Sequence, residues 1–423
     1  MRMIKRSILK TLQKAMADRT MTVLIGSRQV GKTFLMRQLA ASLPKKRQNI
    51  FLIGDDPEVT EVFETLTRFE GFLRSNGIDP EKPITIFVDE FQLIPEISKK
   101  LKWFYDARPR WKFVLSGSSS LNISKNLKEA LVGRVTVFPI HPASFEEFLS
   151  YKDPGAFKTY QNIKLETLKE FKVPERLREW FNHYLLYGGY PAVVIAKNTD
   201  KALETLDNIV RTYIYRDIKA YIKEIKPAHF NHLVTALALQ TGNLLSVNNL
   251  SQFLGMSYRK VEEYLYFLEE LFVIKRVMPF SSKASKEIKK MPKVYFLDTG
   301  IRNMVIKVFT EIMHRPDKGG LLENGVFAEL NCHLDVLSIL RFWRTKQGTE
   351  VDLVVRKNEK QILIEIKSRQ YQTTPHLLPF GSFENIHGKA DQKIIVHMGN
   401  DLIRQKNVLL LPACLSGKIS TLL

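Results

Sequence analysis

The sequence predicts an α/β fold: a three-layer first domain with a parallel sheet between helices, followed by smaller helical and mixed domains. Short, continuous apolar runs recur at residues 21–25, 84–88 and 111–115, and such runs are typical of parallel strands that are buried on both faces. Helical spacing separates the runs, as expected of βαβ units. A glycine-rich loop follows the first run directly, at the carboxyl edge where such sheets place ligands.

That loop lies between the apolar run Met21–Ile25 and the helical pattern of Phe34–Leu43. It fits the phosphate-binding pattern G-x-x-x-x-G-K-[ST] at every defined position, with the residues Gly26, Ser27, Arg28, Gln29, Val30, Gly31, Lys32 and Thr33. Strand, loop and helix in this order predict that backbone amides and the helix N-terminus face the phosphates of a nucleotide. The alternative is a glycine turn before a helix with a chance lysine.

Two side chains of the loop have expected roles. Lys32 should reach the outer phosphates, and Thr33 should hold a magnesium ion. We therefore predict ATP and Mg²⁺ as ligands, and we include Phe34, the first residue after the loop, among the nucleotide-binding residues.

The second buried run, residues 84–88, ends in Asp89 and Glu90. Asp89 is predicted to hold magnesium through water, and Glu90 to orient and activate the water that attacks the terminal phosphate. Two acids at a strand end can also serve solubility alone, but next to the phosphate loop they indicate a Walker B motif.

The third run ends in a serine-rich stretch, residues 116–120, and Gly133-Arg134 comes soon after it. Ser116 is predicted to sense the terminal phosphate, with Ser118 as the rival, although the serines can also cap the next helix. Arg134 is predicted to act in a neighbouring subunit as an arginine finger, so we expect a homo-oligomer. Otherwise it is a surface or phosphate-contacting arginine.

The amino-acid composition indicates which classes of partner the protein can bind. The 423 residues carry a net charge of +20, which favours a polyanion, chiefly nucleic acid, and less often an anionic membrane. Cys332 and Cys414 have no partner spacing, and no apolar run approaches the ~18 residues of a membrane span. These features predict a cytoplasmic protein without membrane association, zinc or disulfide framework. Residues 1–18 are expected to form an amphipathic helix.

Residues 151–225 are mainly helical in pattern and are interrupted by Tyr187-Gly188-Gly189-Tyr190-Pro191, a tight turn. From 226 to 300 the pattern predicts helices at 230–240, 247–253 and 258–271 and a strand at 273–277, a helix-turn-helix arrangement. Tyr258, Arg259 and Lys260 begin the last helix, where such helices meet DNA. The basic stretch 281–286 would form a wing that contacts phosphates. Alternatively, the basic stretch is a solvated loop, or the helix-turn-helix serves only as a protein-docking module.

The last part, residues 301–423, contains an amphipathic helix at 322–337 and a hairpin whose strands span 351–356 and 362–367. Alternation places Glu365 and Lys367 on one face, and Asp352 can reach the same end across the hairpin. Two carboxylates there can bind Mg²⁺ or Mn²⁺, with Lys367 orienting or deprotonating the attacking water. This arrangement resembles the PD-(D/E)xK nucleases, in which Glu323 corresponds to the acid of the first helix. The alternative is a nuclease-like fold kept for binding.

The chain as a whole resembles the AAA-superfamily ATPases of archaea and bacteria that carry a winged helix and a restriction-endonuclease-like C-terminal domain. Besides the motifs above, the resemblance rests on two stretches, Pro142-Ala143-Ser144-Phe145-Glu146-Glu147-Phe148 and residues 187–191. Ser27 departs from the family, which usually has proline there. The resemblance implies an ATPase core at 1–150, a helical lid at 151–225, a winged helix at 226–300 and a nuclease-like domain at 301–423.

Together these features predict an AAA+ protein that hydrolyses ATP, binds DNA, and cleaves or remodels it. The alternative is a nucleotide-driven switch that binds DNA or a protein and does not cut.

Overall fold

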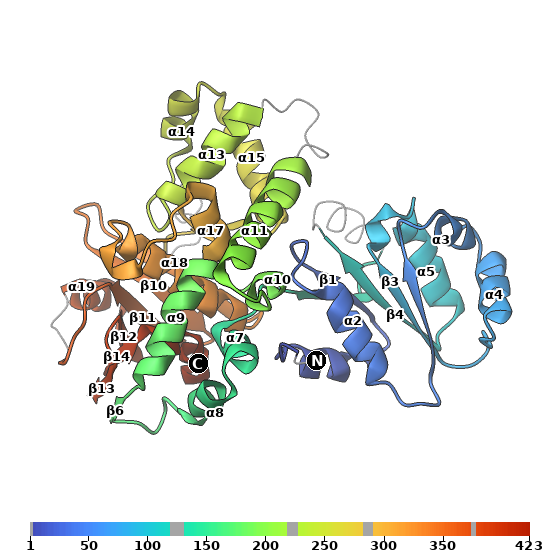
Figure 1. The fold of residues 1–423 in the computed structure, drawn as a ribbon, viewed down its shortest axis with the longest axis horizontal. Helices are drawn as coiled ribbons and strands as arrows, with labels where there is room; N and C mark the ends of the chain where they lie inside the picture. Colours follow the sequence, from blue (N-terminus) through green and yellow to red (C-terminus); the bar gives the residue numbers. More distant parts are fainter. Residues whose placement is uncertain (1–2, 119–130, 218–226, 282–290, 374–377) are drawn as a thin grey trace. The chain divides into compact units, whose positions relative to one another are not determined.

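The computed structural model describes residues 3–118, 131–217, 227–281, 291–373 and 378–423 (Figure 1). The chain divides into two compact units. The first comprises Arg6–His141 with Glu270–Phe272, and the second comprises Met1–Lys5, Pro142–Glu269 and Val273–Leu423. The predicted domains at 151–225, 226–300 and 301–423 therefore fall almost entirely within the second unit.

The described part of the first unit contains a five-stranded sheet in the order β2-β3-β4-β1-β5, with every pairing parallel. Its strands are β1 (Met21–Ile25), β2 (Gln48–Ile53), β3 (Ile84–Asp89), β4 (Trp111–Gly117) and β5 (Val135–Pro139). All residues of β3 and β4 are buried, which explains why their sequences are continuous apolar runs. The predicted parallel sheet is confirmed, and its apolar strands form one core with the neighbouring helices.

The helices of the first unit are α1 (Leu9–Ala15), α2 (Lys32–Ala41), α3 (Pro57–Val62), α4 (Leu66–Ser75) and α5 (Ile97–Ala107). The expectation of a helix over residues 1–18 was wrong in extent, because residues 3–6 have no regular secondary structure. The guanidinium of Arg6 donates to the carbonyl oxygens of Val30, at 2.8 Å, and His141, at 2.7 Å. These side-chain hydrogen bonds hold the segment in place of helical ones.

The described part of the second unit contains a seven-stranded mixed sheet in the order β6-β13-β14-β12-β11-β10-β9. Strands β9, β10 and β11 form an antiparallel meander, and β12 runs parallel to β11. The strands are β6 (Glu170–Lys172), β9 (Ser338–Arg344), β10 (Glu350–Lys357), β11 (Lys360–Lys367), β12 (Gln392–His397), β13 (Asp401–Gln405) and β14 (Val408–Pro412). The short strand β6 lies in the stretch predicted to be a helical lid, yet it pairs with β13.

Helices precede and flank this sheet. Helix α18 (Lys318–His333) packs against β11 and α19 (Leu378–His387) against β10. Between β5 and β7 (Ile274–Val277) the chain forms the helices α7 (Phe145–Lys152), α8 (Pro154–Asn162), α9 (Glu175–Tyr187), α10 (Pro191–Val194), α11 (Thr199–Ile209), α13 (Pro227–Leu239), α14 (Val247–Leu254) and α15 (Tyr258–Glu270). After α15 come β7 (Ile274–Val277) and β8 (Lys293–Phe296), which pair antiparallel, and then α17 (Thr299–Ile306). No helix in the described ranges has both the length and the apolar character required to cross a bilayer.

The predicted turn at residues 187–191 joins α9 to α10. Its Gly189 N–H donates to the Asp298 carboxylate at 2.8 Å, and its carbonyl accepts from the Ala143 N–H at 2.7 Å. A Cβ at Gly189 would lie 2.0 Å from the Ala143 oxygen, and a Cβ at Gly300 would lie 2.1 Å from the Tyr187 oxygen. Backbone contacts this close exclude any side chain, so Gly189 allows the turn to approach the residues before α7, and Gly300 allows α17 to approach the end of α9.

Replacement of Gly189 or Gly300 by alanine should therefore destabilise the second unit, by about 3 kcal/mol or more, because the colliding atoms belong to the backbone. Thermal unfolding followed by circular dichroism measures the effect.

Gly381→Ala is the matched control, since Gly381 lies inside α19 and a Cβ there would meet nothing within 4 Å. Alanine should leave stability unchanged or raise it by about 0.5–1 kcal/mol. Equal losses at Gly381 and Gly189 would contradict the steric explanation.

Candidate functional site

The phosphate-loop residues lie between the end of β1 and the start of α2, as predicted. Gly31 has φ 93° and Gln29 has φ 64°, a backbone conformation that turns successive amides toward the same side. A Cβ at Gly26 would lie 2.3 Å from the carbonyl oxygen of Ile140, so this position requires glycine for space. Phe34 follows on α2 with 39% of its surface exposed.

Lys32 is buried and folds back on its own loop. Its ammonium donates to the carbonyl oxygens of Gly26, at 2.9 Å, and Ser27, at 2.8 Å. Burial lowers the pKa of Lys32 to about 8, although the charges of Glu90 and Asp89 oppose that shift. Among the described residues, the hydrogen bonds of this ammonium go to two neutral backbone carbonyls. Phosphate oxygens would be stronger partners.

Asp89 is the last residue of β3, and two hydroxyl groups bind its carboxylate. Thr33 Oγ1 donates to Asp89 Oδ2 at 2.5 Å, and Ser116 Oγ donates to Asp89 Oδ1. The three side chains come from α2, β3 and β4, which the strand order brings to one edge of the sheet. Oxygen donors of these kinds suit Mg²⁺, so the predicted metal-binding pair Thr33 and Asp89 fits that ion.

Glu90 follows Asp89 with φ 50°. The side-chain amide of Gln92 donates to Glu90 Oε2 at 2.6 Å and lies 3.3 Å from Ser118 Oγ. Sequence reasoning assigned no role to Gln92, although it lies only two residues beyond the acid. The structure shows that this amide holds the carboxylate of the predicted base.

Arg134 lies in the turn before β5 and is paired within its own chain. Its guanidinium forms two bonds of 3.0 Å to the carboxylate of Asp106. This ion pair gives Arg134 a local partner on α5, and its predicted role in a neighbouring subunit remains a prediction.

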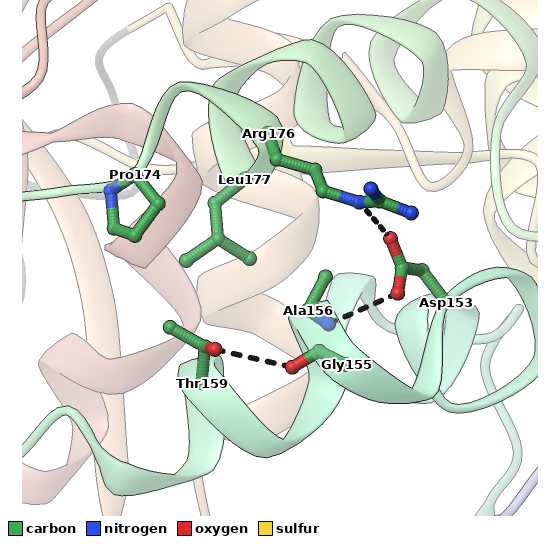
Figure 2. A pocket seen from close by; sticks show the side chains of 7 residues that line it. All are labelled: Asp153, Gly155, Ala156, Thr159, Pro174, Arg176 and Leu177. Carbon is green, nitrogen blue, oxygen red and sulfur yellow. Dashed lines mark hydrogen bonds and ion pairs between the residues drawn. The ribbon is translucent and has the colours of Figure 1, made fainter.

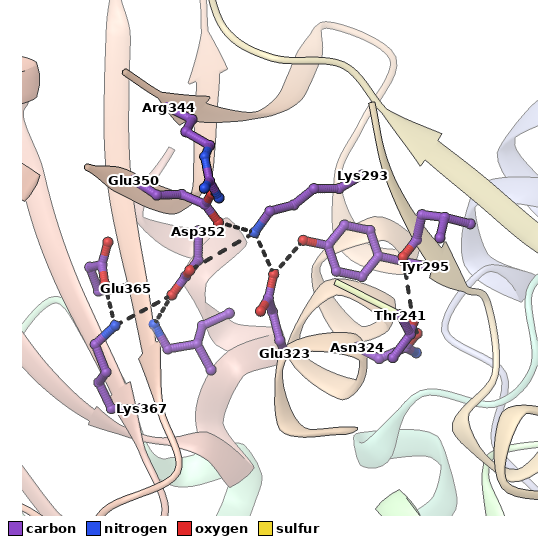
Figure 3. A network of polar contacts seen from close by, with 12 residues as sticks. Thr241, Lys293, Tyr295, Glu323, Asn324, Arg344, Glu350, Asp352, Glu365 and Lys367 are labelled. Carbon is purple, nitrogen blue, oxygen red and sulfur yellow. Dashed lines mark hydrogen bonds and ion pairs between the residues drawn. The ribbon is translucent and has the colours of Figure 1, made fainter. Parts of the chain in front are cut away.

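The second set of predicted residues meets in the second unit (Figure 3). Asp352 Oδ2 accepts the N–H of Ile366 at 2.7 Å, and the ammonium of Lys367 lies 3.9 Å from the same oxygen. Lys367 also pairs with Glu365 Oε2 at 2.5 Å. The hairpin of β10 and β11 therefore brings Asp352, Glu365 and Lys367 together.

Glu365 is almost fully buried, at 1% exposed. Burial, with the charge of Asp352 as the second cause, raises its pKa to about 8. Its Oε1 has no hydrogen-bond partner among the residues that the structure describes. An unpartnered carboxylate oxygen beside a second carboxylate is a suitable ligand for a divalent cation, so Asp352 and Glu365 fit the predicted Mg²⁺ or Mn²⁺.

Glu323 lies on α18 and has other partners. Its Oε1 accepts from Lys293 at 2.9 Å and from the Tyr295 hydroxyl at 2.6 Å (Figure 3). Burial raises the pKa of Glu323 to about 7. Sequence reasoning missed Lys293 and Tyr295, and also Glu350, which pairs with Lys293 at 2.5 Å. A lysine among basic residues gave no signal that it would be buried.

The predicted DNA-contacting residues lie at the start of α15. Tyr258 is 52% exposed and Arg259 is also exposed, whereas Lys260 pairs with Glu263 at 2.9 Å. On β7, Arg276 bridges two glutamates of α15, at 2.7 and 2.8 Å. Of the basic stretch 281–286, only Ser281 belongs to the described residues. Among the described residues of this surface, Lys260 and Arg276 are thus both paired with glutamates of α15.

A separate cavity of about 270 Å³ lies between α8 and the start of α9 (Figure 2). Asp153 at its edge pairs with Arg176 and accepts the Ala156 N–H at 3.0 Å. None of the predicted site residues lines this cavity.

Three domain families match the chain. Residues 18–149 match an AAA domain, residues 178–311 match a domain of unknown function (DUF8612), and residues 318–415 match another (DUF4143). The AAA match contains the whole parallel sheet and its phosphate loop. With that geometry it supports an AAA-superfamily ATPase, and hence nucleotide binding and hydrolysis by the first unit.

Two relatives bear the name uncharacterized protein. An uncharacterized protein of Mycobacterium tuberculosis is 25% identical over 366 residues, covering 86% of this chain and 74% of the relative. One of Methanocaldococcus jannaschii is 26% identical over 348 residues, covering 81% and 73%. Among solved structures, the Walker-type ATPase PABY2304 of Pyrococcus abyssi aligns with a TM-score of 0.48 at 14% identity, covering 72% of this chain and 96% of that one.

Lys32→Ala and Glu90→Gln should each lower ATP turnover about 100-fold or more, because one removes the charge that binds the phosphates and the other removes the base. Glu90→Gln should still bind ATP. Phosphate release and nucleotide binding are the two measurements.

Lys46→Ala is a suitable control, since Lys46 is exposed after α2 and its loss removes the same charge. Turnover that survives both site substitutions would contradict the assignment.

If Arg134 acts across a subunit boundary, Arg134→Ala should be inactive alone and regain part of its turnover when mixed with Lys32→Ala. The second variant lacks a working site but supplies an intact arginine. Turnover is measured over a range of mixing ratios.

Asp106→Ala distinguishes a role of Arg134 in a neighbouring subunit from a structural role in its own chain. The substitution breaks the ion pair and keeps the arginine. An equal loss in Asp106→Ala, with no recovery on mixing, would assign Arg134 a structural role within its own chain.

Proposed function

We propose that this chain is an ATP-driven DNA-binding protein, in which hydrolysis in the first unit changes how the second unit engages DNA. The observation that carries the proposal is the convergence of Lys32, Thr33, Asp89 and Glu90 at the carboxyl edge of the parallel sheet. Groups suited to phosphate binding, magnesium coordination and water activation are present there.

On this proposal ATP enters the loop and Lys32 exchanges its bonds to Gly26 and Ser27 for phosphate oxygens. The loop amides and the N-terminus of α2 supply further donors. Thr33 and Asp89 hold Mg²⁺, which neutralises charge on the phosphates. The hydroxyl of Ser116, one strand away, responds to the terminal phosphate through its bond to Asp89.

Hydrolysis then depends on Glu90. Its carboxylate accepts a proton from the attacking water, and the hydrogen bond from Gln92 to Oε2 orients that carboxylate. Arg134 from a second copy completes the site. The assembly proposed is a homo-oligomer.

DNA binding is supported by the net charge of +20 and by the order of elements in residues 227–296. Three helices followed by an antiparallel pair of strands are the elements of a winged helix, with α15 as the helix that meets DNA. Tyr258 and Arg259 are exposed at its N-terminal end, where base or phosphate contacts occur.

The order α18, β9, β10, β11, α19, β12, with Asp352, Glu365 and Lys367 at one end, supports a nuclease-like fold in the last part. Cleavage of DNA with Mg²⁺ or Mn²⁺ held by Asp352 and Glu365, and Lys367 orienting the water, is the finer form of the proposal. The ion pairs that occupy Glu323 favour the other form, a switch that binds and does not cut.

Duplex DNA binding by the full chain should weaken steeply between 50 and 200 mM salt, because phosphate contacts release counterions. Arg259→Ala should lower affinity about fivefold or more and reduce the salt slope by about one. Fluorescence anisotropy with ATP or ADP present measures both the affinity and its dependence on nucleotide.

Arg178→Ala, which removes an arginine already paired with Glu175 on α9, is the control and should bind as the parent does. A flat salt response would point to a protein partner. In the same reactions with Mg²⁺ or Mn²⁺, cleavage lost in Asp352→Ala and Glu365→Ala supports the cutting form, and intact DNA with the parent supports the switch.

A further inference from the structure

Lys293 lies among the carboxylates of Glu323, Glu350 and Asp352, which together with Glu365 are called the acidic cluster here (Figure 3). It is the first residue of β8 and is only 2% exposed. Its ammonium lies 2.9 Å from Glu323 Oε1, 2.5 Å from Glu350 Oε1 and 4.0 Å from Asp352 Oδ1. One cation from the β7–β8 hairpin thus faces carboxylates on two other elements, α18 and β10.

The backbone around Lys293 is fixed by its neighbours. Tyr295 stacks on Phe327 of α18 with ring centroids 4.3 Å apart. The Phe296 N–H donates to Asn324 Oδ1 at 2.8 Å, and Asn324 Nδ2 donates back to the Phe296 oxygen at 2.9 Å. Because β8 is held on α18 at these points, the lysine side chain is directed into the cluster.

With Lys293 in place, no group of three or more acidic, histidine or cysteine side chains among the described residues is arranged to hold a metal ion. The carboxylates of Glu323, Glu350 and Asp352 face the ammonium instead, and divalent ions prefer oxygen ligands of this kind. An ammonium and a divalent cation repel each other strongly at these distances where water is excluded. The cluster therefore cannot hold both at Glu323 and Glu350.

We propose that Lys293 is a built-in cation that takes the place of a divalent ion at Glu323 and Glu350 and fastens the β7–β8 hairpin to the acidic cluster. Any metal ion that binds is confined to the part of the cluster away from Glu323 and Glu350. Glu365 Oε1 lies there and is unpartnered among the described residues. This inference concerns the cluster alone and does not depend on ATP hydrolysis or DNA binding.

Lys293→Met keeps the length of the side chain and removes its charge. Without divalent ions its melting temperature should fall by about 5 °C or more, because buried carboxylates lose their partner. Added MnCl₂ or MgCl₂ should then recover at least half of that loss, since the ion can enter the vacated position. The full chain without nucleotide is used, and differential scanning fluorimetry gives both values.

Lys275→Met is the matched control. Lys275 lies on the other strand of the same hairpin, and its ammonium donates to the neutral amide oxygen of Asn331 at 2.6 Å. The same charge is lost there, but no gain in metal response is expected. The double variant Lys293→Met with Glu323→Gln should lose the recovery, because a ligand of the new ion is gone.

A metal-induced rise in melting temperature that is no larger in Lys293→Met than in the parent would overturn the proposal, as would full recovery in the double variant. If Lys293→Met does not fold, Mn²⁺ binding to the parent is counted by electron paramagnetic resonance. Compared with a variant carrying Asp352→Asn and Glu365→Gln, the parent should bind at most one additional ion. Two additional ions would show that Lys293 does not exclude the second.

Discussion

Parallel pairing of β3 with β4, and of β4 with β1, is the constraint on which the nucleotide site depends. Parallel strands all end at the same edge of a sheet, so the loop after β1, Asp89 at the tip of β3 and Ser116 near the tip of β4 are brought together without any further device. The hydroxyl of Ser116 bonds to Asp89, and Thr33 reaches the same carboxylate from α2. A change in strand order would separate these groups while leaving every local motif intact.

In the second unit, the candidate site depends on the pairing of buried carboxylates with cations. Four carboxylates, those of Glu323, Glu350, Asp352 and Glu365, are wholly or largely removed from water near one end of β10 and β11, and an unpaired buried charge is costly. Lys293 and Lys367 lie between them, and Arg344 pairs with Glu350 at 2.7 Å. Burial is the main cause that raises the pKa values of Glu323 and Glu365.

The sequence was enough to predict the main strands that carry the candidate residues of both sites. The strands at 21–25, 84–88 and 111–115 were predicted because fully buried parallel strands have continuous apolar runs. The hairpin was predicted because two apolar runs flank the turn residues 358–360. It did not reach β6, a three-residue strand that has no periodicity to detect, nor the start of the chain, where two bonds from Arg6 replace a helix. It also did not indicate that Arg276, on the strand after α15, pairs with two glutamates of that helix.

The sequence by itself determined the phosphate loop, the acids at the end of β3 and the hairpin that carries Asp352, Glu365 and Lys367. Each of these depends on residues that are close along the chain or on a regular period. Only the tertiary structure decided the partners of two other predicted residues: Asp106 for Arg134, and Lys293 for Glu323. Hydrophobic periodicity reports which face of an element is buried. It does not report which charged group from a distant segment will be buried beside it, because that choice is made when the elements pack.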